Sequence, residues 1–500
     1  MKVLVANRGE IACRVMAALR ERGWRSVAVA SEADRTALHA RTADECVEIG
    51  PAAAAQSYLD IERILDAAKR SGAQAIHPGY GFLSENAAFA SAVEAAGLVF
   101  LGPRGETMAL LGDKRRARAV AIEAGVPVVP GWEGDPSDLG GATKAAAGIG
   151  WPVLVKAALG GGGKGMTRVS DAPALSEALE AAARVAKSAF GDASVFLEKA
   201  IPAPRHVEVQ IFGDGKGHVV HLGERECSLQ RRHQKVVEES PSSAIDADLR
   251  RRLTEAAVAI GRAVKYRSAG TCEFLVAPDG SFYFLEVNAR IQVEHPVTEL
   301  VTGRDLVHSQ LELAETGEMP LVQEELVARG FAVEARVYAE DPDSGFLPQS
   351  GRLLRVEFPS GPWLRVDAGV ATGDEITPHY DPMIAKVIAF GSSRERAWRR
   401  LARALDATVV HGPVTNLAFL RELVSREDVR RGEYHVTSIE ETFLPERAGR
   451  VPDLSLLVAA AAIADRLGLS GNGVAARVIA SGEEAPVDDP FDTLAGWRHS

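Results

Sequence analysis

The ten residues from Glu286 to His295 read EVNARIQVEH, and polar and apolar side chains alternate in them as far as Glu294. In a β-strand, successive side chains point to opposite faces, so the pattern predicts one apolar and one polar face. The polar face would carry Glu286, Asn288, Arg290, Gln292 and Glu294. A half-buried strand with a solvated face is the simpler interpretation. Because two acids, two amides and an arginine can bind a metal, an anion or a proton, we favour a functional face.

This strand is predicted to pair with the segment before it. Thr271–Ala277 has a strand pattern, and a Pro-Asp-Gly turn separates it from the return strand Ser281–Asn288. Such a turn would place Glu273 within about one residue of facing Glu286. Two facing carboxylates repel each other unless a cation lies between them, and Mg²⁺ prefers carboxylate and amide oxygens. The hairpin therefore predicts a site for a divalent metal and a nucleoside triphosphate, with Asn288 on the same face.

The chain before this hairpin begins with alternating strand and helix patterns over residues 1–110. The predicted strands are Lys2–Ala6, Ser26–Ala30, Ala73–Ile76 and Leu98–Leu101, and the predicted helices are Ile11–Arg22, Tyr58–Ser71 and Phe89–Ala96. This alternation predicts a doubly wound parallel sheet. The first turn, Asn7–Glu10, has one glycine and is no dinucleotide fingerprint. His77–Asn86 follows a predicted strand, where such sheets bind ligands, although a turn with a helix cap explains it more simply.

A glycine-rich segment lies between two further predicted strands. Leu159–Met166 reads LGGGGKGM and joins Trp151–Lys156 to Thr167–Val169. Glycines let backbone N–H groups approach a phosphate closely, and a mobile glycine loop can act as a lid. A flexible hairpin is the alternative. We favour a phosphate-binding loop, one that differs from a Walker A loop because it leads into a strand and not into a helix.

Positive charge gathers in one stretch of a protein that is acidic overall. Glu224–Lys235 reads ERECSLQRRHQK and follows the predicted strand Arg205–Phe212. A solvated basic loop is the usual explanation of such a run. The sharper interpretation is a pocket for phosphate or bicarbonate, because arginine and lysine are the usual partners of these anions.

Composition restricts the class of protein. Five hundred residues predict two to four domains, and a formal net charge of −11 argues against binding to nucleic acid or to anionic membranes. The four cysteines are scattered without a Cys-x-x-Cys pair, which favours a reducing, cytoplasmic environment over a disulfide framework or a zinc site. The first residues run straight into a predicted strand, so we expect no secretory signal. The apolar stretch Leu456–Ile463 is too short to span a bilayer.

The C-terminal part predicts mostly strands. Phe331–Tyr338 alternates, with Glu334, Arg336 and Tyr338 on one face. Further strands are predicted at Gly351–Phe358, Trp363–Asp367 and Ala385–Phe390, and helices at Leu249–Val264, Ser393–Ala407 and Leu454–Leu467.

Six motifs, in order, resemble the biotin carboxylase component of biotin-dependent acyl-CoA carboxylases, which has an ATP-grasp fold. They are Ala6–Ala12, His77–Asn86, Lys156–Met166, Arg231–Lys235, Glu286–Glu299 and His379–Met383. The resemblance implies a mixed α/β and α+β protein: a doubly wound, Rossmann-like domain over 1–112, an ATP-grasp domain over 113–330 with a mobile lid at 131–200, a C-terminal mixed β/α domain over 331–445, and a connector tail over 446–500.

The resemblance also implies roles for single residues. ATP would contact Lys114, Lys156, Gly162, Gly163, Glu198, Ile201, His206, Gln230, His233, Glu273 and Glu286. Mg²⁺ or Mn²⁺ would be held by Glu273, Glu286 and Asn288. Bicarbonate would contact Lys235, Arg290, Gln292 and Val293, and biotin would contact Tyr80, Gly81 and Arg336. The implied catalytic residues are Arg290, Glu294, Arg336 and Lys235, with Glu294 as the base that deprotonates bicarbonate. Arg290 and Glu294 can both face one bicarbonate only if the strand bends, so we expect the regular strand to break near Arg290.

The implied activity is ATP-dependent carboxylation of biotin by bicarbonate, through carboxyphosphate. The implied partners are a biotin carboxyl carrier domain and a carboxyltransferase subunit, in a homo-oligomer or a hetero-oligomeric complex. The carrier's Met-Lys-Met acceptor is absent, so we expect the carrier on another chain or segment. Two alternatives are an ATP-grasp ligase that joins a carboxylate to an amine, and a silent scaffold of a carboxylase complex. The downstream acyl-CoA is left open.

Overall fold

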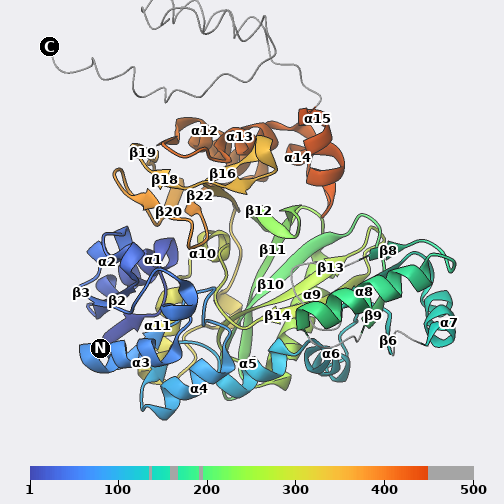
Figure 1. Cartoon of the computed structure of the whole chain (residues 1–500), viewed down its shortest axis with the longest axis horizontal. Coiled ribbons are helices and arrows are strands. Elements are labelled where there is room, and N and C mark those ends of the chain that lie inside the picture. The colour runs from blue at the N-terminus through green and yellow to red at the C-terminus, as the bar shows by residue number, and fades with distance from the viewer. Residues whose placement is uncertain (135–137, 158–166, 191–194, 449–500) are drawn as a thin grey trace, which may run out of the picture. The chain divides into compact units, whose positions relative to one another are not determined.

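The computed structural model describes residues 1–134, 138–157, 167–190 and 195–448 (Figure 1). Backbone contacts divide the chain into two compact units, Met1–Phe443 and Leu444–Ser500. In the second unit the described element is helix α15 (Leu444–Ala448). The helix predicted at Leu454–Leu467 lies outside the described residues. Among the residues with described positions, no helix is both long and apolar enough to cross a bilayer.

The N-terminal part forms a five-stranded parallel sheet in the order β3-β2-β1-β4-β5. Its strands and the helices between them are β1 (Lys2–Val5), α1 (Gly9–Glu21), β2 (Arg25–Ala30), α2 (Leu38–Thr42), β3 (Glu45–Glu48), α3 (Ile61–Ser71), β4 (Ala75–His77), α4 (Ala87–Ala95) and β5 (Val99–Phe100). Adjacent residues of β1 enter different cores: Val3 lies with Ile11 of α1, whereas Leu4 lies with Ile64 of α3. Helices therefore cover both faces, which confirms the predicted doubly wound sheet.

Two helices lead from this sheet to the next part of the chain, α5 (Gly105–Gly112) and α6 (Lys114–Glu123). The Asp113 side chain accepts hydrogen bonds from the N–H groups of Arg115 and Arg116, at 2.9 and 3.1 Å. This N-cap makes Lys114 the first residue of α6.

A small antiparallel sheet follows, in the order β6-β9-β7-β8. It comprises β6 (Gly131–Gly134), β7 (Val153–Ala157), β8 (Thr167–Val169) and β9 (Val195–Lys199), with helices α7 (Leu139–Ile149) and α8 (Leu175–Phe190). Val155, Leu179 and Leu197 belong to its core. Both strands predicted to flank the glycine-rich segment are present and pair with each other. Residues 158–166 lie outside the described residues. They include the whole glycine-rich segment, and with it Gly162 and Gly163.

An eight-stranded antiparallel sheet, in the order β14-β13-β10-β11-β12-β15-β22-β20, carries most of the predicted chemistry. Its strands are β10 (Arg205–Asp214), β11 (Val219–Arg231), β12 (Gln234–Ser240), β13 (Arg267–Val276), β14 (Phe282–Asn288), β15 (Phe331–Tyr338), β20 (Leu364–Ala368) and β22 (Met383–Gly391). Helices α9 (Ala247–Ala263), α10 (His295–Thr302) and α11 (Leu306–Thr316) accompany it. Because β12 pairs with β15, the sheet continues across residue 330. The domain boundaries implied by the resemblance stay predictions.

The remaining elements of the first unit are short strands and helices. They are β16 (Glu340–Asp341), β17 (Leu347–Pro348), β18 (Gly351–Arg352), β19 (Arg355–Glu357), β21 (Glu375–Ile376), β23 (Val409–His411), α12 (Arg394–Ala407), α13 (Leu417–Ser425) and α14 (Glu427–Arg431), with a π-helical turn at Ile439–Phe443. The single strand predicted at Gly351–Phe358 is wrong. The chain forms β18 and β19 there because these two segments pair with different partners, β21 and β23.

The charged run Glu224–Lys235 is not a solvated loop. Strand β11 continues through Arg231, and β12 begins at Gln234. Arg225, Glu226 and Gln230 are buried. The charges that this run carries within β11 are therefore buried, as expected of an internal polar site, whereas Arg232 and His233 are exposed in the turn.

Candidate active site

The hairpin β13–β14 has the predicted register. Glu273 is the cross-strand partner of Glu286, and Thr271 is that of Asn288. Strand β14 ends at Asn288 and helix α10 begins at His295, so residues 289–294 form a loop. The alternating polar face is therefore regular only in its first half, and the strand ends close to Arg290, where a break is expected. Gln292 and Glu294 are nevertheless buried, each 2% exposed.

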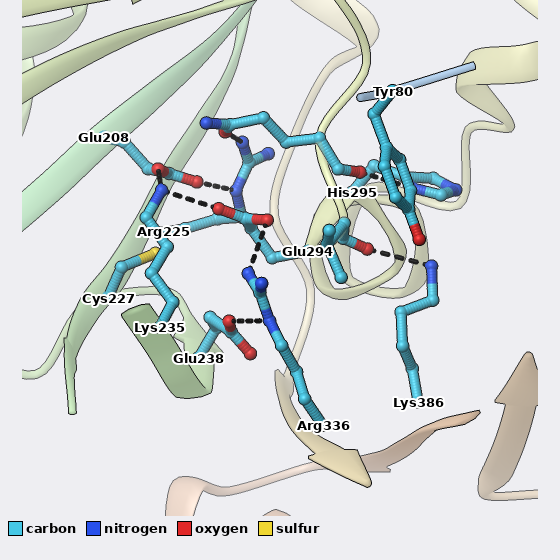
Figure 2. A network of polar contacts seen from close by, with 12 residues as sticks. Tyr80, Glu208, Arg225, Cys227, Lys235, Glu238, Glu294, His295, Arg336 and Lys386 are labelled. Atoms are coloured by element: carbon cyan, nitrogen blue, oxygen red, sulfur yellow. Dashed lines mark hydrogen bonds and ion pairs between the residues drawn. The ribbon is translucent and has the colours of Figure 1, made fainter. Parts of the chain in front are cut away.

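Lys235 of β12 joins three carboxylates that come from three segments. Figure 2 shows two of them, Glu208 and Glu294. Lys235 Nζ lies 2.5 Å from Glu208 Oε2, 2.7 Å from Glu294 Oε1 and 2.8 Å from Glu273 Oε1. Burial alone would lower the pKa of Lys235, but these carboxylates raise it well above its usual value. The lysine is therefore charged, and it places the residue predicted as the base, Glu294, beside a predicted metal ligand, Glu273.

Arg336 of β15 approaches Glu294 from the other side (Figure 2). Its Nη2 donates to Glu294 Oε2 at 2.9 Å, and its Nε donates to Glu238 Oε1 at 2.6 Å. Burial works to raise the pKa of Glu294, but Lys235 and Arg336 hold it well below its usual range. Glu294 is thus a buried, ionised carboxylate clamped between two cations.

Arg225 of β11 also supports this cluster, and sequence reasoning missed it. The side chain is fully buried and pairs with Glu208. It also donates to Gln210, Thr271, Gln292 and Thr298 at 2.7 to 3.0 Å. Gln292 in turn donates to Glu273 Oε1 at 2.9 Å. The signal in the sequence was the order Glu224-Arg225-Glu226 within the charged run, where an alternating strand pattern places Arg225 on the face opposite to its neighbours.

The predicted nucleotide and metal residues fall into two groups. His206 Nε2 lies 3.0 Å from Glu273 Oε2, and its Nδ1 lies 2.9 Å from Gln230 Nε2. This first group adjoins Glu286, which is half-buried, and the charge of Lys114 acts on Glu286. The second group is the ion pair between Lys156 and Glu198 in the small sheet. Ile201 is half-buried, and His233 is exposed in the turn between β11 and β12.

The donor set at Glu273 and Glu286 fits a divalent cation. Burial, and then the neighbouring charge of Glu273, raise the pKa of Glu286, so a cation bound beside it would stabilise its ionised form. Asn288 Nδ2 donates to Glu273 Oε1 at 2.9 Å, which brings its amide to the same carboxylate. His206, Glu208 and Glu273 also offer donor atoms within 4.8 Å of one another. Hard oxygen ligands of this kind suit Mg²⁺ or Mn²⁺.

The residues predicted to contact bicarbonate and biotin surround the loop before α10. Arg290 donates to Asn288 Oδ1 at 2.9 Å, and its Nε lies 3.0 Å from Glu85 Oε2. The Val293 carbonyl accepts from Lys386 Nζ at 2.9 Å. Tyr80 donates its hydroxyl to Glu10, and Gly81 follows it with a φ of +70° that favours glycine. Asn7 donates to the carbonyls of Pro78 and Tyr80, at 2.8 and 2.7 Å, which fixes this turn.

Three family models match the chain. The one described as biotin carboxylase, N-terminal domain, matches residues 1–108; carbamoyl-phosphate synthase L chain, ATP binding domain, matches 113–322; and biotin carboxylase C-terminal domain matches 334–441. The chain is 46% identical over 501 residues to the alpha subunit of mitochondrial methylcrotonoyl-CoA carboxylase from Dictyostelium discoideum, covering 99% of this chain and 70% of that protein. It is 47% identical to a pyruvate carboxylase subunit from Methanothermobacter thermautotrophicus, covering 88% and 89%.

Solved structures resemble the fold over most of the chain. The biotin carboxylase domain of 2-oxoglutarate carboxylase from Hydrogenobacter thermophilus, in complex with MgADP, ADP and bicarbonate, matches with a TM-score of 0.82 at 43% identity. The match covers 88% of this chain and 97% of that one. The chain spans 70% of the Dictyostelium protein and 62% of its rat counterpart of the same name.

Proposed function

The chain belongs to the biotin carboxylase family, as its motifs predict, and from this premise we propose that it carboxylates biotin with bicarbonate in an ATP-dependent reaction. One observation supports this most strongly. Glu294 is a buried carboxylate held between Lys235 and Arg336, at 2.7 and 2.9 Å. Two converging cations form a site for a small anion, and the carboxylate between them is a base already in place.

Bicarbonate is a weak electrophile, so it is first activated by phosphoryl transfer from ATP to give carboxyphosphate. In our proposal Lys235, Arg290, Gln292 and the backbone of Val293 bind bicarbonate, and Glu294 takes its proton. The pairing with two cations makes Glu294 a poor base before the substrate binds. A bicarbonate anion that shares those cations weakens their pull on Glu294 and raises its affinity for a proton. The substrate thereby activates its own base.

Carboxyphosphate then yields CO₂ and phosphate. The released phosphate is proposed to take the proton from N1 of biotin, and the deprotonated N1 then attacks CO₂ to form carboxybiotin. Arg336 is proposed to stabilise the negative charge that develops on the ureido oxygen of biotin. Tyr80 and Gly81 are proposed to border the ureido ring. Arg336 suits its role because it is buried and already oriented by Glu238 at 2.6 Å, so little reorganisation is needed when charge develops.

ATP is proposed to lie against His206, Gln230 and the hairpin β13–β14, where Glu273, Glu286 and Asn288 would hold Mg²⁺ or Mn²⁺. The bound cation supplies positive charge that screens the phosphate oxygens. Lys114, Lys156, Glu198, Ile201 and His233 complete the proposed nucleotide contacts, with Gly162 and Gly163 over the phosphates. His206 and Lys235 keep Glu273 ionised by lowering its pKa against the effect of burial, so this residue is ready to act as a ligand.

The decisive experiment replaces Glu294 by glutamine. We expect bicarbonate-dependent ATP cleavage and transfer of labelled bicarbonate to free biotin to be lost, while binding of ADP is retained. Glu357→Gln, which removes an exposed carboxylate paired with Arg355, is the matched control and should behave as wild type. Loss of ADP binding in Glu294→Gln would contradict the role assigned to this residue.

Two other functions are outcomes of the same assay. Wild-type ATP cleavage that is indifferent to free biotin would favour a ligase that joins a carboxylate to an amine. Unchanged biotin carboxylation by the assembled carboxylase complex after Arg336→Ala would favour a silent scaffold, because the activity would then belong to another subunit. The predicted run of Arg290, Gln292 and Glu294 supports the carboxylase, because it supplies groups for bicarbonate.

The proposed partners follow from the half-reaction. Carboxylated biotin needs a carrier domain and a carboxyltransferase subunit, and we propose that the protein acts with both in an oligomeric acyl-CoA carboxylase of the cytoplasm. Its relatives include both methylcrotonoyl-CoA and pyruvate carboxylase subunits, so the family alone leaves the final acceptor open. Co-purification with a carboxyltransferase would identify the acceptor, and fractionation of the source cells would test the compartment.

A further inference from the structure

Three neighbouring strands carry buried charges on one face of the large sheet. Glu238 of β12 is the cross-strand partner of Glu334 on β15, and Arg336 of β15 is the partner of Lys386 on β22. Residues opposite each other share a face, and so do residues two apart on one strand. All four side chains therefore lie on the same side of the sheet, and each is at most 6% exposed. The proposed reaction uses Arg336 and gives no role to Glu334.

Glu334 is fully buried, and neither of its carboxylate oxygens has a hydrogen-bond partner among the residues that the structure describes. Glu238 has one such oxygen, Oε2, while its Oε1 accepts from Arg336. Opposite residues in an antiparallel pair have Cβ atoms about 4.5 to 5.5 Å apart, well within reach of two glutamate side chains. The unsatisfied oxygens of the two residues can therefore satisfy each other if a proton lies between them.

The groups around Glu334 do not offer it a cation of its own. Those that act on it are Lys386 of β22, Glu238 of β12, Arg336 of its own strand and Glu294 before α10. Lys386 Nζ is directed to the Val293 carbonyl at 2.9 Å and to Glu10 Oε1 at 3.2 Å. Arg336 is divided between Glu238 and Glu294. A buried carboxylate without hydrogen bonds is costly as an anion and far less so when protonated.

Burial is the main cause that raises the pKa of both acids. The pKa of Glu334 is raised well above its usual value, and that of Glu238 is raised to about 7. Arg336 lowers the pKa of Glu238, with which it makes its ion pair, and this pair favours the proton on the partner, Glu334. The distribution of charge thus agrees with the unsatisfied oxygens.

We propose that Glu334 is a positioning residue for Arg336: it carries a proton and donates it in a hydrogen bond to the free Oε2 of Glu238. That bond holds Glu238 so that its other oxygen fixes Nε of Arg336. The Nη2 atom at the other end of the guanidinium is then directed at Glu294 and at the proposed position of biotin. The expected effect of Glu334 on biotin carboxylation rests on the proposed function. The presence of the proton on Glu334 rests only on the contacts and burial of the four charged residues.

Two substitutions separate this role from simple packing. Glu334→Gln keeps a neutral donor, its amide, towards Glu238, whereas Glu334→Met fills similar space without one. We expect kcat/KM for free biotin to fall about tenfold in Glu334→Met and to change less than about threefold in Glu334→Gln, because a hydrogen bond to a charged group is lost only in the former. The KM for ATP should be unchanged in both, since the nucleotide residues are on other strands.

The pH profile gives a second readout. In wild type, biotin carboxylation should decline on the alkaline side as Glu334 loses its proton and repels Glu238. Glu334→Gln cannot lose a proton there, so its alkaline limit should move upward. A wild-type kinetic constant in Glu334→Met, or equal losses in both variants, would overturn the proposal. Thermal unfolding and ADP binding establish that each variant is folded.

Infrared spectroscopy tests the proton without relying on activity. The wild-type protein should show the C=O band of a buried protonated carboxyl at pH 7, which Glu334→Gln removes and Glu238→Gln shifts. Absence of that band overturns the proposal even if the enzyme is active. If wild type lacks biotin carboxylation but shows the band, the proposed function fails and the protonated pair stands.

Discussion

At the scale of the residue, the centre of the site is a cluster in which acidic and basic side chains alternate. Each carboxylate partner of Lys235 also touches a second basic group: Glu208 pairs with Arg225, Glu273 lies 3.0 Å from His206, and Glu294 lies 2.9 Å from Arg336. Because each of these three carboxylates has two basic partners, all three can be buried in the ionised form. The same arrangement keeps Glu294 and Glu273 ionised in the roles proposed for them.

Replacing Lys235 should therefore affect stability as well as activity. In Lys235→Met three buried carboxylates lose their shared cation, and we expect the free energy of unfolding to fall by about 3 kcal/mol. Bicarbonate-dependent ATP cleavage should fall about 10²-fold or more. Lys235→Arg, which keeps the charge, should lose less stability. Urea unfolding at pH 7 measures the difference, and equal stability of the methionine variant and wild type would contradict this account.

Sequence reasoning identified only some of the acidic and basic residues of this cluster. Alternation placed Glu294 and Arg336 on polar strand faces, and their roles came from the family resemblance. Their contact was not predicted, because no local sequence pattern pairs residues 42 positions apart. The role of Arg225 was not predicted, because a run of charged residues is usually solvated and the sequence does not show that this strand is internal to the sheet. Its partners are 15 to 73 residues away. The assigned roles of single residues stay predictions.

At the scale of the element, the hairpin β13–β14 was predictable because its register depends on a turn of a few residues. The pairing of Glu273 with Glu286 follows from the turn near Gly280. The break near Arg290 was expected from the two roles that meet there, but the contacts that end β14 were not, because they come from a distant segment. The Ala289 N–H donates to Glu85 Oε1 at 3.1 Å, and Arg290 lies 3.0 Å from the same carboxylate. These contacts replace the sheet ladder and release the chain into the loop that precedes α10.

The hairpin predicts opposite effects of Glu286→Gln with and without metal. Without metal the variant should be more stable than wild type by roughly 0.5 to 1 kcal/mol, because a like charge opposite Glu273 is removed. With MgADP the wild type should gain more stability than the variant, because it keeps the proposed ligand. Thermal unfolding with and without MgADP measures both effects. Glu255→Gln, on the exposed side of α9, is the control.

The prediction for Glu286 would be contradicted by one pattern in particular. If Glu286→Gln and wild type gained equal stability from MgADP, the carboxylate would have no part in holding the cation. A variant that is less stable than wild type without metal would instead indicate that Glu286 makes a favourable contact, and the repulsion from Glu273 would not be its main interaction.

At the scale of the first unit as a whole, single buried carboxylates tie together segments that lie far apart in the sequence. Glu299 of α10 contacts Arg14 of α1 at 3.1 Å and Arg365 of β20 at 2.6 Å, and it accepts from the Leu306 N–H of α11 at 2.7 Å. The doubly wound sheet was predictable because its alternation of strands and helices is local. The contacts of Glu299 were not predictable, since Arg14 and Glu299 are 285 residues apart.

Glu299 should therefore contribute stability that depends on pH. Burial favours its neutral form, but Arg14 and Arg365 lower its pKa below the usual value. The unfolded chain then binds a proton that the folded chain does not, so stability from this group is present above about pH 4.5 and is lost as the pH falls through the lowered pKa. In Glu299→Gln we expect unfolding at pH 7 to cost about 2 kcal/mol less, with a shallower loss of stability below pH 4.5. Glu395→Gln, an exposed carboxylate on α12, should follow wild type. Urea unfolding between pH 3 and 7 tests this. If the free energy of unfolding changed with pH in parallel for Glu299→Gln and wild type, the contacts of Glu299 would not be linked to proton binding.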